Sequence, residues 1–269
     1  MRVILGIDAA WTDRQPSGVA LVKGEGRRWS CLAVAASYQA FIERASGPTV
    51  DCMTRQPGVC PEPKTLLDAA KRIADAAVDI VTIDMPVSNR RIAGRREADN
   101  AISRSYGARW CSAHSPSVER PGNLGSRLTN EFEALGYPVA TTDDNSGTVA
   151  RLVEVYPHVG LLALLQRDMR VPYKVSKSSK YWPNTTPETR IGRLLDEFAK
   201  IRRALGESFS CVSLSLPARG AVATLNDLKR YEDALDALVC CWIGTRYVSG
   251  DVMALGDTHA AIWCPRALA

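Results

Sequence analysis

The sequence predicts an α/β protein with a mixed sheet, and three observations indicate this fold class. Apolar runs over residues 3–7, 18–22 and 29–35 are separated by short gaps, which predicts antiparallel strands. A helical pattern over 64–77 leads directly into another apolar run, 78–86, and this order favours a parallel neighbour for the first strand. Later apolar runs again alternate with helical patterns, so we expect one α/β domain.

The composition is that of an ordinary globular chain. Its 269 residues are 46% hydrophobic, and no run approaches the roughly 18 continuous apolar residues that span a bilayer. Arg2 is charged and the first strand follows at once, so we expect no signal peptide. None of the eight cysteines forms a C-x-x-C pair, which favours buried thiols in a reducing compartment. We therefore predict a soluble, cytoplasmic protein with no membrane partner.

Two of the predicted core strands end in a carboxylate. Asp8 follows the first apolar run, and Asp84 lies near the end of the run over 78–86. Proline and glycine predict a loop over 46–63, between these two strands. An ionised side chain at the rim of a buried sheet is costly unless it is paired, hydrogen-bonded or bound to a cation. Both aspartates are therefore candidate site residues.

Residues 88–150 read as an insertion within a single domain, 1–269. We expect helices over 97–105 and 128–135 and mostly loop elsewhere in this region. The formal net charge of the chain is +5, which is compatible with a polyanionic partner. Much of the excess lies in this region, at Arg90, Arg91, Arg95, Arg96, Arg104, Arg109, Arg120 and Arg127.

The rest of the chain continues the alternation of strands and helices. Thr186 is positioned to cap the first of two long helices, with Glu188 in its first turn. We predict a strand over 151–157, helices over 159–167, 186–205 and 226–247, and two short strands or a docked tail over 252–255 and 260–263.

Two further carboxylates belong to the last long helix. Asp233 and Asp236 are three residues apart, so both lie on one face, and that face is mostly apolar. Close carboxylates repel each other unless a cation screens them. Together with Asp8 and Asp84 they would form an oxygen-rich pocket that suits Mg²⁺ or Mn²⁺.

Each acid also has a purely structural interpretation. Asp8 and Asp84 could cap turns, and Asp236 could pair with Arg230 or Arg246. Glu154, on the predicted strand 151–157, could be a core acid with its own partner. The combination of two strand-terminal aspartates with an inward D-x-x-D helix is more specific than any one of them.

The order of these acids resembles that of the RNase H-like superfamily, and their spacing is similar to that of Holliday-junction resolvases of the RuvC type. The chain is more similar still to an uncharacterised bacterial and archaeal family of predicted nucleases with this fold. The matching motifs are Gly6-Ile7-Asp8, Thr82-Ile83-Asp84, Arg96 with Asp99, Glu154 to Pro157, Glu232 to Leu238, and Trp263-Cys264-Pro265.

This resemblance implies a mixed five-stranded sheet, with three antiparallel strands first and parallel strands after, flanked by helices. It also implies a metal-dependent nuclease in which two Mg²⁺ ions about 4 Å apart activate water and stabilise the leaving oxygen. Asp8 would bridge the ions, Asp84 would bind one of them, and Asp233 or Asp236 would complete the site. Glu154 would be a catalytic acid that lies farther from the metals.

Basic residues are the candidate contacts for nucleic acid. Arginine and lysine neutralise phosphates, and nearby aromatic rings could stack on bases. The alternative is that these charges only solvate the surface, and that Arg96 forms an internal ion pair with Asp99. The candidate substrate-binding residues are Arg95, Arg96, Arg104, Lys174 and Lys177.

Two other functions compete with the nuclease. One is ATP-dependent phosphotransfer of the actin and sugar-kinase type, but the chain is short for two duplicated halves and has no G-x-G-x-x-G or P-loop. The other is a non-catalytic module that binds nucleic acid or protein on the same fold, because a fold does not fix a function.

Overall fold

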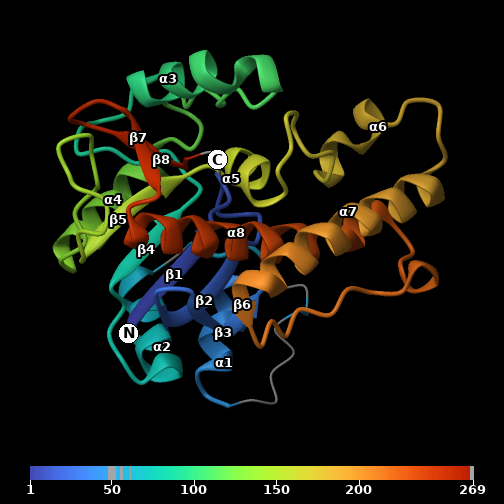
Figure 1. Ribbon diagram of the computed structural model, residues 1–269, viewed down its shortest axis with the longest axis horizontal. Coiled ribbons are helices and arrows are strands. Elements are labelled where there is room, and N and C mark those ends of the chain that lie inside the picture. The colour runs from blue at the N-terminus through green and yellow to red at the C-terminus, as the bar shows by residue number, and fades with distance from the viewer. Residues whose placement is uncertain (48–52, 55–56, 61, 267–269) are drawn as a thin grey trace.

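A computed structural model describes residues 1–47, 53–54, 57–60 and 62–266 of the chain. Parts of the loop predicted over 46–63 lie outside the described residues. Among those described, no helix is long and apolar enough to cross a membrane. The chain forms one mixed sheet flanked by helices (Figure 1).

The sheet has eight strands within the described residues, in the order β6-β3-β2-β1-β4-β5-β8-β7. Strands β1 to β3 are antiparallel to one another, whereas β4, β5 and β8 continue from β1 in parallel. The five strands expected from the resemblance are too few, because β6 joins β3 at one edge and a β7-β8 hairpin joins β5 at the other. The bounds are β1 Arg2–Asp8, β2 Gly18–Glu25, β3 Arg28–Ala35, β4 Ile80–Ile83, β5 Arg151–Val155, β6 Phe209–Ser210, β7 Val252–Gly256 and β8 Ala261–Pro265.

Apolar side chains form a core on each face of the sheet. On one face α8 crosses the central strands with α7 and α5 beside it, and on the other α1, α2 and α4 pack. The helices are α1 Tyr38–Arg44, α2 Pro63–Ala74, α3 Glu97–Tyr106, α4 Asn123–Ala134, α5 Pro157–Leu164, α6 Ser178–Tyr181, α7 Pro187–Ser208 and α8 Lys229–Ser249, with short 3-10 turns η1 Gly107–Arg109, η2 Val175–Lys177, η3 Arg219–Ala221 and η4 Leu225–Leu228.

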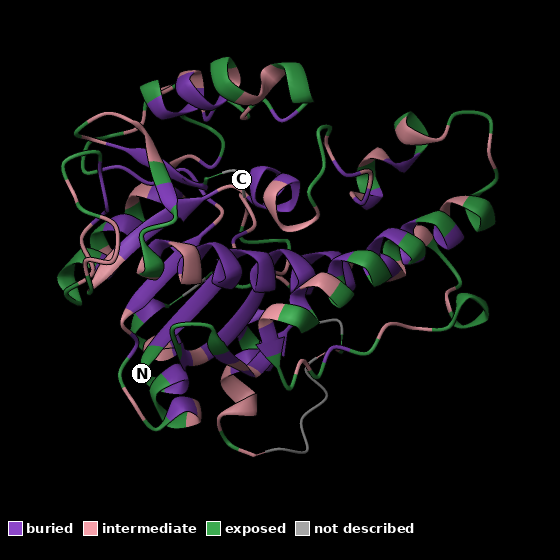
Figure 2. Cartoon of the chain, in the orientation of Figure 1, coloured by how far each residue is buried: buried purple, intermediate pink, exposed green. Residues whose placement is uncertain are grey.

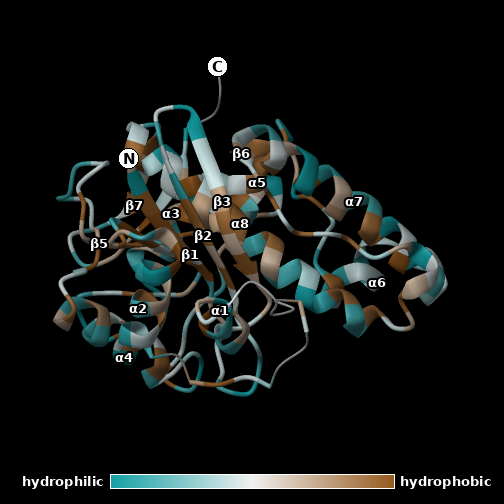
Figure 3. Ribbon diagram, turned by 90° about the horizontal axis from the view of Figure 1, so that it is seen from below, coloured by the Kyte–Doolittle hydropathy of each residue, from teal (hydrophilic) through white to brown (hydrophobic). Residues whose placement is uncertain are grey.

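Helix α8 is the centre of the fold. It is buried along most of its length (Figure 2), and from Ala237 to Gly244 it is apolar on every side rather than along a single stripe. Helix α7, by contrast, alternates hydrophilic and hydrophobic residues along its exposed length (Figure 3). As predicted, α7 is capped by Thr186, whose side chain accepts a hydrogen bond from the amide of Thr189.

The arginine-rich region 88–150 contributes to two parts of the fold. Helix α3 packs against β7 and β8, whereas α4 packs against α2 and β5. The tail that the sequence left open as strands or a docked segment forms the β7-β8 hairpin. The region and the tail therefore meet along one edge of the sheet.

Candidate functional site

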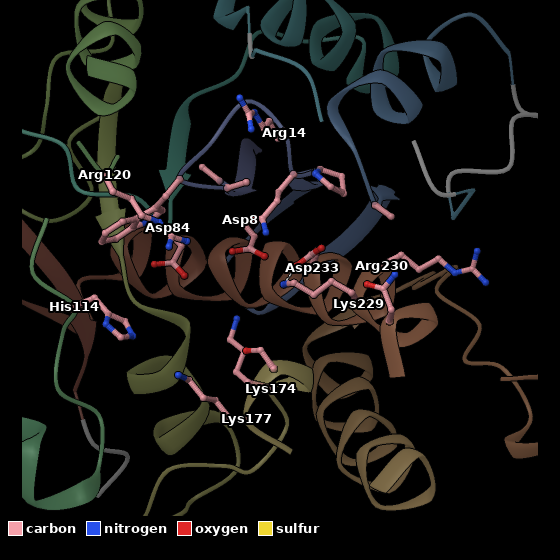
Figure 4. A pocket seen from close by; sticks show the side chains of 18 of the residues that line it. Asp8, Arg14, Asp84, His114, Arg120, Lys174, Lys177, Lys229, Arg230 and Asp233 are labelled. Carbon is pink, nitrogen blue, oxygen red and sulfur yellow. Dashed lines mark hydrogen bonds and ion pairs between the residues drawn. The ribbon is translucent and has the colours of Figure 1, made fainter. Parts of the chain in front are cut away.

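A cavity of about 730 Å³ lies at the carboxyl ends of β1 and β4. In sheets that contain parallel strands, ligands commonly bind in the crevice outside these ends. Four acids and six basic residues line it, so it is strongly charged (Figure 4). They are Asp8, Asp84, Asp227, Asp233, Arg14, Arg120, Lys174, Lys177, Lys229 and Arg230.

The pairing of β1 with β4 places Asp8 and Asp84 side by side. Ile7 lies opposite Ile83 in the parallel register, and the amide of Asp84 donates to the carbonyl of Ile7 at 2.9 Å. Side chains alternate between the two faces of a strand. Because both isoleucines point into the core beneath α1 and α2, both aspartates point toward α8.

Helix α8 approaches these strand ends through contacts between main chains. A Cβ atom added at Gly6 would lie 2.5 Å from the carbonyl oxygen of Ala237, and one at Gly18 would lie 2.0 Å from that of Asp233. Only glycine allows such an approach at these two positions. The glycine of the Gly6-Ile7-Asp8 motif therefore helps to place the acids of α8 over the strand ends.

Asp233 and Asp236, which the sequence placed on one face of α8, occupy different surroundings. Asp233 lines the cavity, and its buried Oδ2 atom has no hydrogen-bond partner among the residues that the structure describes. Asp236 is fully buried and does not line the cavity. One of its oxygens accepts from the Tyr173 hydroxyl at 2.6 Å and the other from the Lys174 ammonium group.

Two lysines lie among the acids, and the sequence did not predict this role for either. Lys174 contacts Asp236 and lies 3.4 Å from Glu232. Lys229 contacts Asp233 and lies 2.8 Å from Glu232. Ammonium groups therefore offset part of the repulsion among the acids. The sequence alone had suggested that divalent cations would screen this repulsion. A basic residue one turn before an acidic cluster on a helix was the available signal for Lys229.

Asp8 and Asp84 keep the strongest electrostatic conflict. Burial raises the pKa of Asp8 to about 7 despite the attraction of Lys174, and repulsion by Asp233 adds to the rise. Burial and then repulsion by Asp8 raise the pKa of Asp84 well above its usual range. Among the described residues, no hydrogen bond to either carboxyl group is found. Burial likewise raises the pKa of Asp233 and of Asp236 to about 6, against Lys229 and Lys174 respectively.

Glu154 lies away from this cavity and is fully paired. Its two oxygens accept from Arg96 at 2.6 Å each, and one also accepts from the amide of Val87 at 3.0 Å. Glu154 is opposite Ile83 in the pairing of β4 with β5, so alternation directs it to the face remote from α8. This placement argues against the predicted catalytic role of Glu154 and against a substrate contact by Arg96, which also pairs with Asp99.

Of the other predicted substrate contacts, two line the cavity and two do not. Lys174 and Lys177 are part of its wall. Arg95 is absent from the lining and donates instead to its own neighbourhood, including Asn100 and Ser103, and Arg104 forms an exposed ion pair with Glu97. The arginine-rich region reaches the cavity through other residues, His114, Ser115, Ser117 and Arg120.

The donor set fits one hard cation better than two. Among the described residues, no three histidine, cysteine or carboxylate side chains form a ready cation site. Mg²⁺, however, is commonly held by one or two carboxylates together with water and substrate phosphates. Asp8 and Asp84 can supply such a pair, whereas Asp236 is occupied by Tyr173 and Lys174.

Residues 6–260 match the family described as a protein of unknown function, DUF429, and the chain belongs to this family. No curated protein and no solved structure matches the chain.

Proposed function

We propose that this DUF429 protein hydrolyses phosphodiester bonds of nucleic acid with the help of Mg²⁺ or Mn²⁺. The observation that carries the proposal is the pair Asp8 and Asp84. These carboxylates lie on adjacent parallel strand ends, have raised pKa values, and face a cavity whose other walls are largely basic. A pair of acids that is only partly compensated by nearby ammonium groups favours a divalent cation, and basic walls favour a polyanion.

Asp8 and Asp84 would hold the ion, which when bound supplies Lewis-acid activation of water and of a phosphoryl oxygen. Lys177 and Arg120 lie on the cavity wall, where they can bind substrate phosphates. Trp11 also lines the cavity and offers an aromatic face to a base. Asp236 is a positioning residue in this scheme, because it fixes Lys174 and Tyr173 rather than facing the substrate.

The strand arrangement supports the same proposal. Strands β1 to β3 are antiparallel and β4 and β5 follow in parallel, which is the arrangement that the resemblance to RNase H-like nucleases implies. The acids at the ends of β1 and β4 and on a late helix also match the motif positions of that resemblance. These likenesses support an RNase H-like fold without assigning an activity.

Replacing Asp8 tests the proposal directly. We expect Asp8→Asn to abolish Mn²⁺-dependent cleavage of a panel of single-stranded, duplex and branched DNA and RNA, with the circular dichroism spectrum unchanged. Asp68→Asn is the matched control, because Asp68 is an exposed aspartate on α2 that forms an ion pair with nearby Lys64. Cleavage that persists in Asp8→Asn, or that needs no divalent cation, would contradict the proposal.

The same panel separates the competing functions. A non-catalytic binding module would bind nucleic acid equally well before and after Asp8→Asn and would cleave none of it. A phosphotransferase would show an ATP-dependent rise in melting temperature, which the proposed hydrolase would lack.

A further inference from the structure

Acids outnumber bases in the cluster beneath the cavity. The carboxylates of Asp8, Asp84, Glu232, Asp233 and Asp236 interact electrostatically with one another, and two ammonium groups lie among them. Lys229 is bound to the acids of the first turns of α8. Both lysines also act on Asp8 at the end of β1, but Lys174 does so more strongly and acts on Asp84 as well.

Lys174 is held in this position because it and both of its chain neighbours contact acids of α8. The Tyr173 hydroxyl donates to Asp236 at 2.6 Å, and the amide of Val175 donates to Glu232 at 2.6 Å. Lys174, between them, contacts the other oxygen of Asp236. Its side chain is only 18% exposed. Lys174 is therefore a largely buried member of the cluster and not a surface lysine that reaches it from solvent.

The direction of the Lys174 side chain completes the argument. It extends from the wall opposite the strands toward Asp8 (Figure 4). Among neighbouring cations, it is the strongest attraction acting on the carboxyl groups of Asp8 and of Asp84. The Lys174 ammonium group therefore acts on Asp8 and Asp84, the acids whose charge a second metal ion would otherwise balance.

We propose that the Lys174 ammonium group serves as a resident cation in place of a second metal ion, so that the site binds one divalent ion per chain, at Asp8 and Asp84. This inference rests on the proposed function and revises its two-metal form. Lys174 is thus a positioning and charge-balancing residue, not a contact for nucleic acid.

Counting bound Mn²⁺ tests the inference without measuring activity. Isothermal titration of the full chain with MnCl₂, checked by electron paramagnetic resonance of free Mn²⁺, should give one ion per chain for the wild type. Lys174→Met should bind two, because the second oxygen of Asp236 becomes free and the positive charge beside Asp8 and Asp84 is lost. Lys177→Met is the matched control and should still bind one, since Lys177 lines the same cavity but forms no ion pair with any described residue.

Lys174→Arg keeps the positive charge and should still bind one ion. This variant, together with the ion count of the wild type, keeps the inference testable if Lys174→Met does not fold. Two ions in the wild type, or one in a folded Lys174→Met, would overturn the inference. Cleavage by a wild type that binds two ions would leave the proposed function standing and remove only this inference. If the wild type binds one ion and Lys174→Met binds two, but no nucleic acid is cleaved, this inference stands and the proposed function is overturned.

Discussion

Two clusters of buried charge lie at the ends of neighbouring strands, one on each side of the sheet, and they differ in how completely they are paired. In the Arg96 cluster, all four carboxylate oxygens of Glu154 and Asp99 accept hydrogen bonds. In the cluster at the cavity, Asp233 has a buried oxygen with no hydrogen-bond partner in the described part of the chain, and Asp8 and Asp84 have strongly raised pKa values. Complete pairing fits a structural role, whereas an unbalanced set of acids open to a cavity fits the capture of a cation.

Removing the centre of the paired cluster should have the largest effect on stability. Arg96→Met would leave Glu154 and Asp99 buried without their guanidinium partner, at a cost of about 3–5 kcal/mol. Urea denaturation should show this loss, while Arg104→Met, which breaks an exposed ion pair, should change the free energy of unfolding by about 1 kcal/mol or less. If Arg96→Met changes the free energy of unfolding only slightly, the ion pairs of Arg96 contribute little to stability. The contrast between the two charge clusters would then be wrong.

Neutralising an acid of the unbalanced cluster should stabilise the protein. The pKa of Asp8 is about 7 in the fold and near 3.9 in an unfolded chain. The folded state therefore loses stability as the pH rises from about 4 to 7. We expect Asp8→Asn to gain about 1–2 kcal/mol at pH 8, allowing for partial exposure, and nothing at pH 4.

Urea midpoints of the wild type and Asp8→Asn at both pH values measure this gain. Asp68→Asn is again the control and should not change with pH in the same direction, because Lys64 lowers the pKa of Asp68. A destabilised Asp8→Asn at pH 8 would show that Asp8 has a stabilising partner in the fold.

A divalent cation should remove the same conflict by binding. At ten times its dissociation constant, Mn²⁺ would stabilise the wild type by about 1.4 kcal/mol. The rise in melting temperature should be larger at pH 8 than at pH 5, because protons compete for Asp8 and Asp84, and it should disappear in Asp8→Asn. Equal shifts at both pH values would place the ion elsewhere.

The smallest change in stability is expected at the cavity wall. Lys177→Met should alter the free energy of unfolding by no more than about 0.5 kcal/mol. If Lys177 contacts a phosphate, the slope of log affinity against log salt for single-stranded DNA should fall by about 0.7. Arg104→Met, on a residue outside the cavity lining, should leave this slope unchanged.

The sequence was informative where a strand ends in an acid. The apolar runs before Asp8 and Asp84 predicted buried strands, and their helix-then-strand order predicted the parallel pairing that brings both carboxyl groups together. The D-x-x-D spacing similarly predicted that Asp233 and Asp236 share a helix face. Periodicity within one element was enough for these inferences.

Relations between elements were harder to predict. The sequence analysis grouped Glu154 with the candidate catalytic acids. In a strand that is buried on both faces, the sequence pattern does not show toward which face a given side chain points. That follows only from the register with Ile83. Lys174 lies in a stretch without periodicity, so its contact with Asp236, 62 positions away along the chain, had no local signal. Strands β6 and β8 pair across similarly large separations.

Glycines at two neighbouring strands set the depth of the site. At Gly6 and Gly18 the main chain packs directly on that of α8, so no change of rotamer can bring the helix closer to these strands. Backbone contacts therefore set the floor of the cavity, whereas His114 and Ser115 on its rim belong to irregular loop. Substitutions in this rim would change the shape of the molecule that the cavity admits, while the acids beneath keep their spacing.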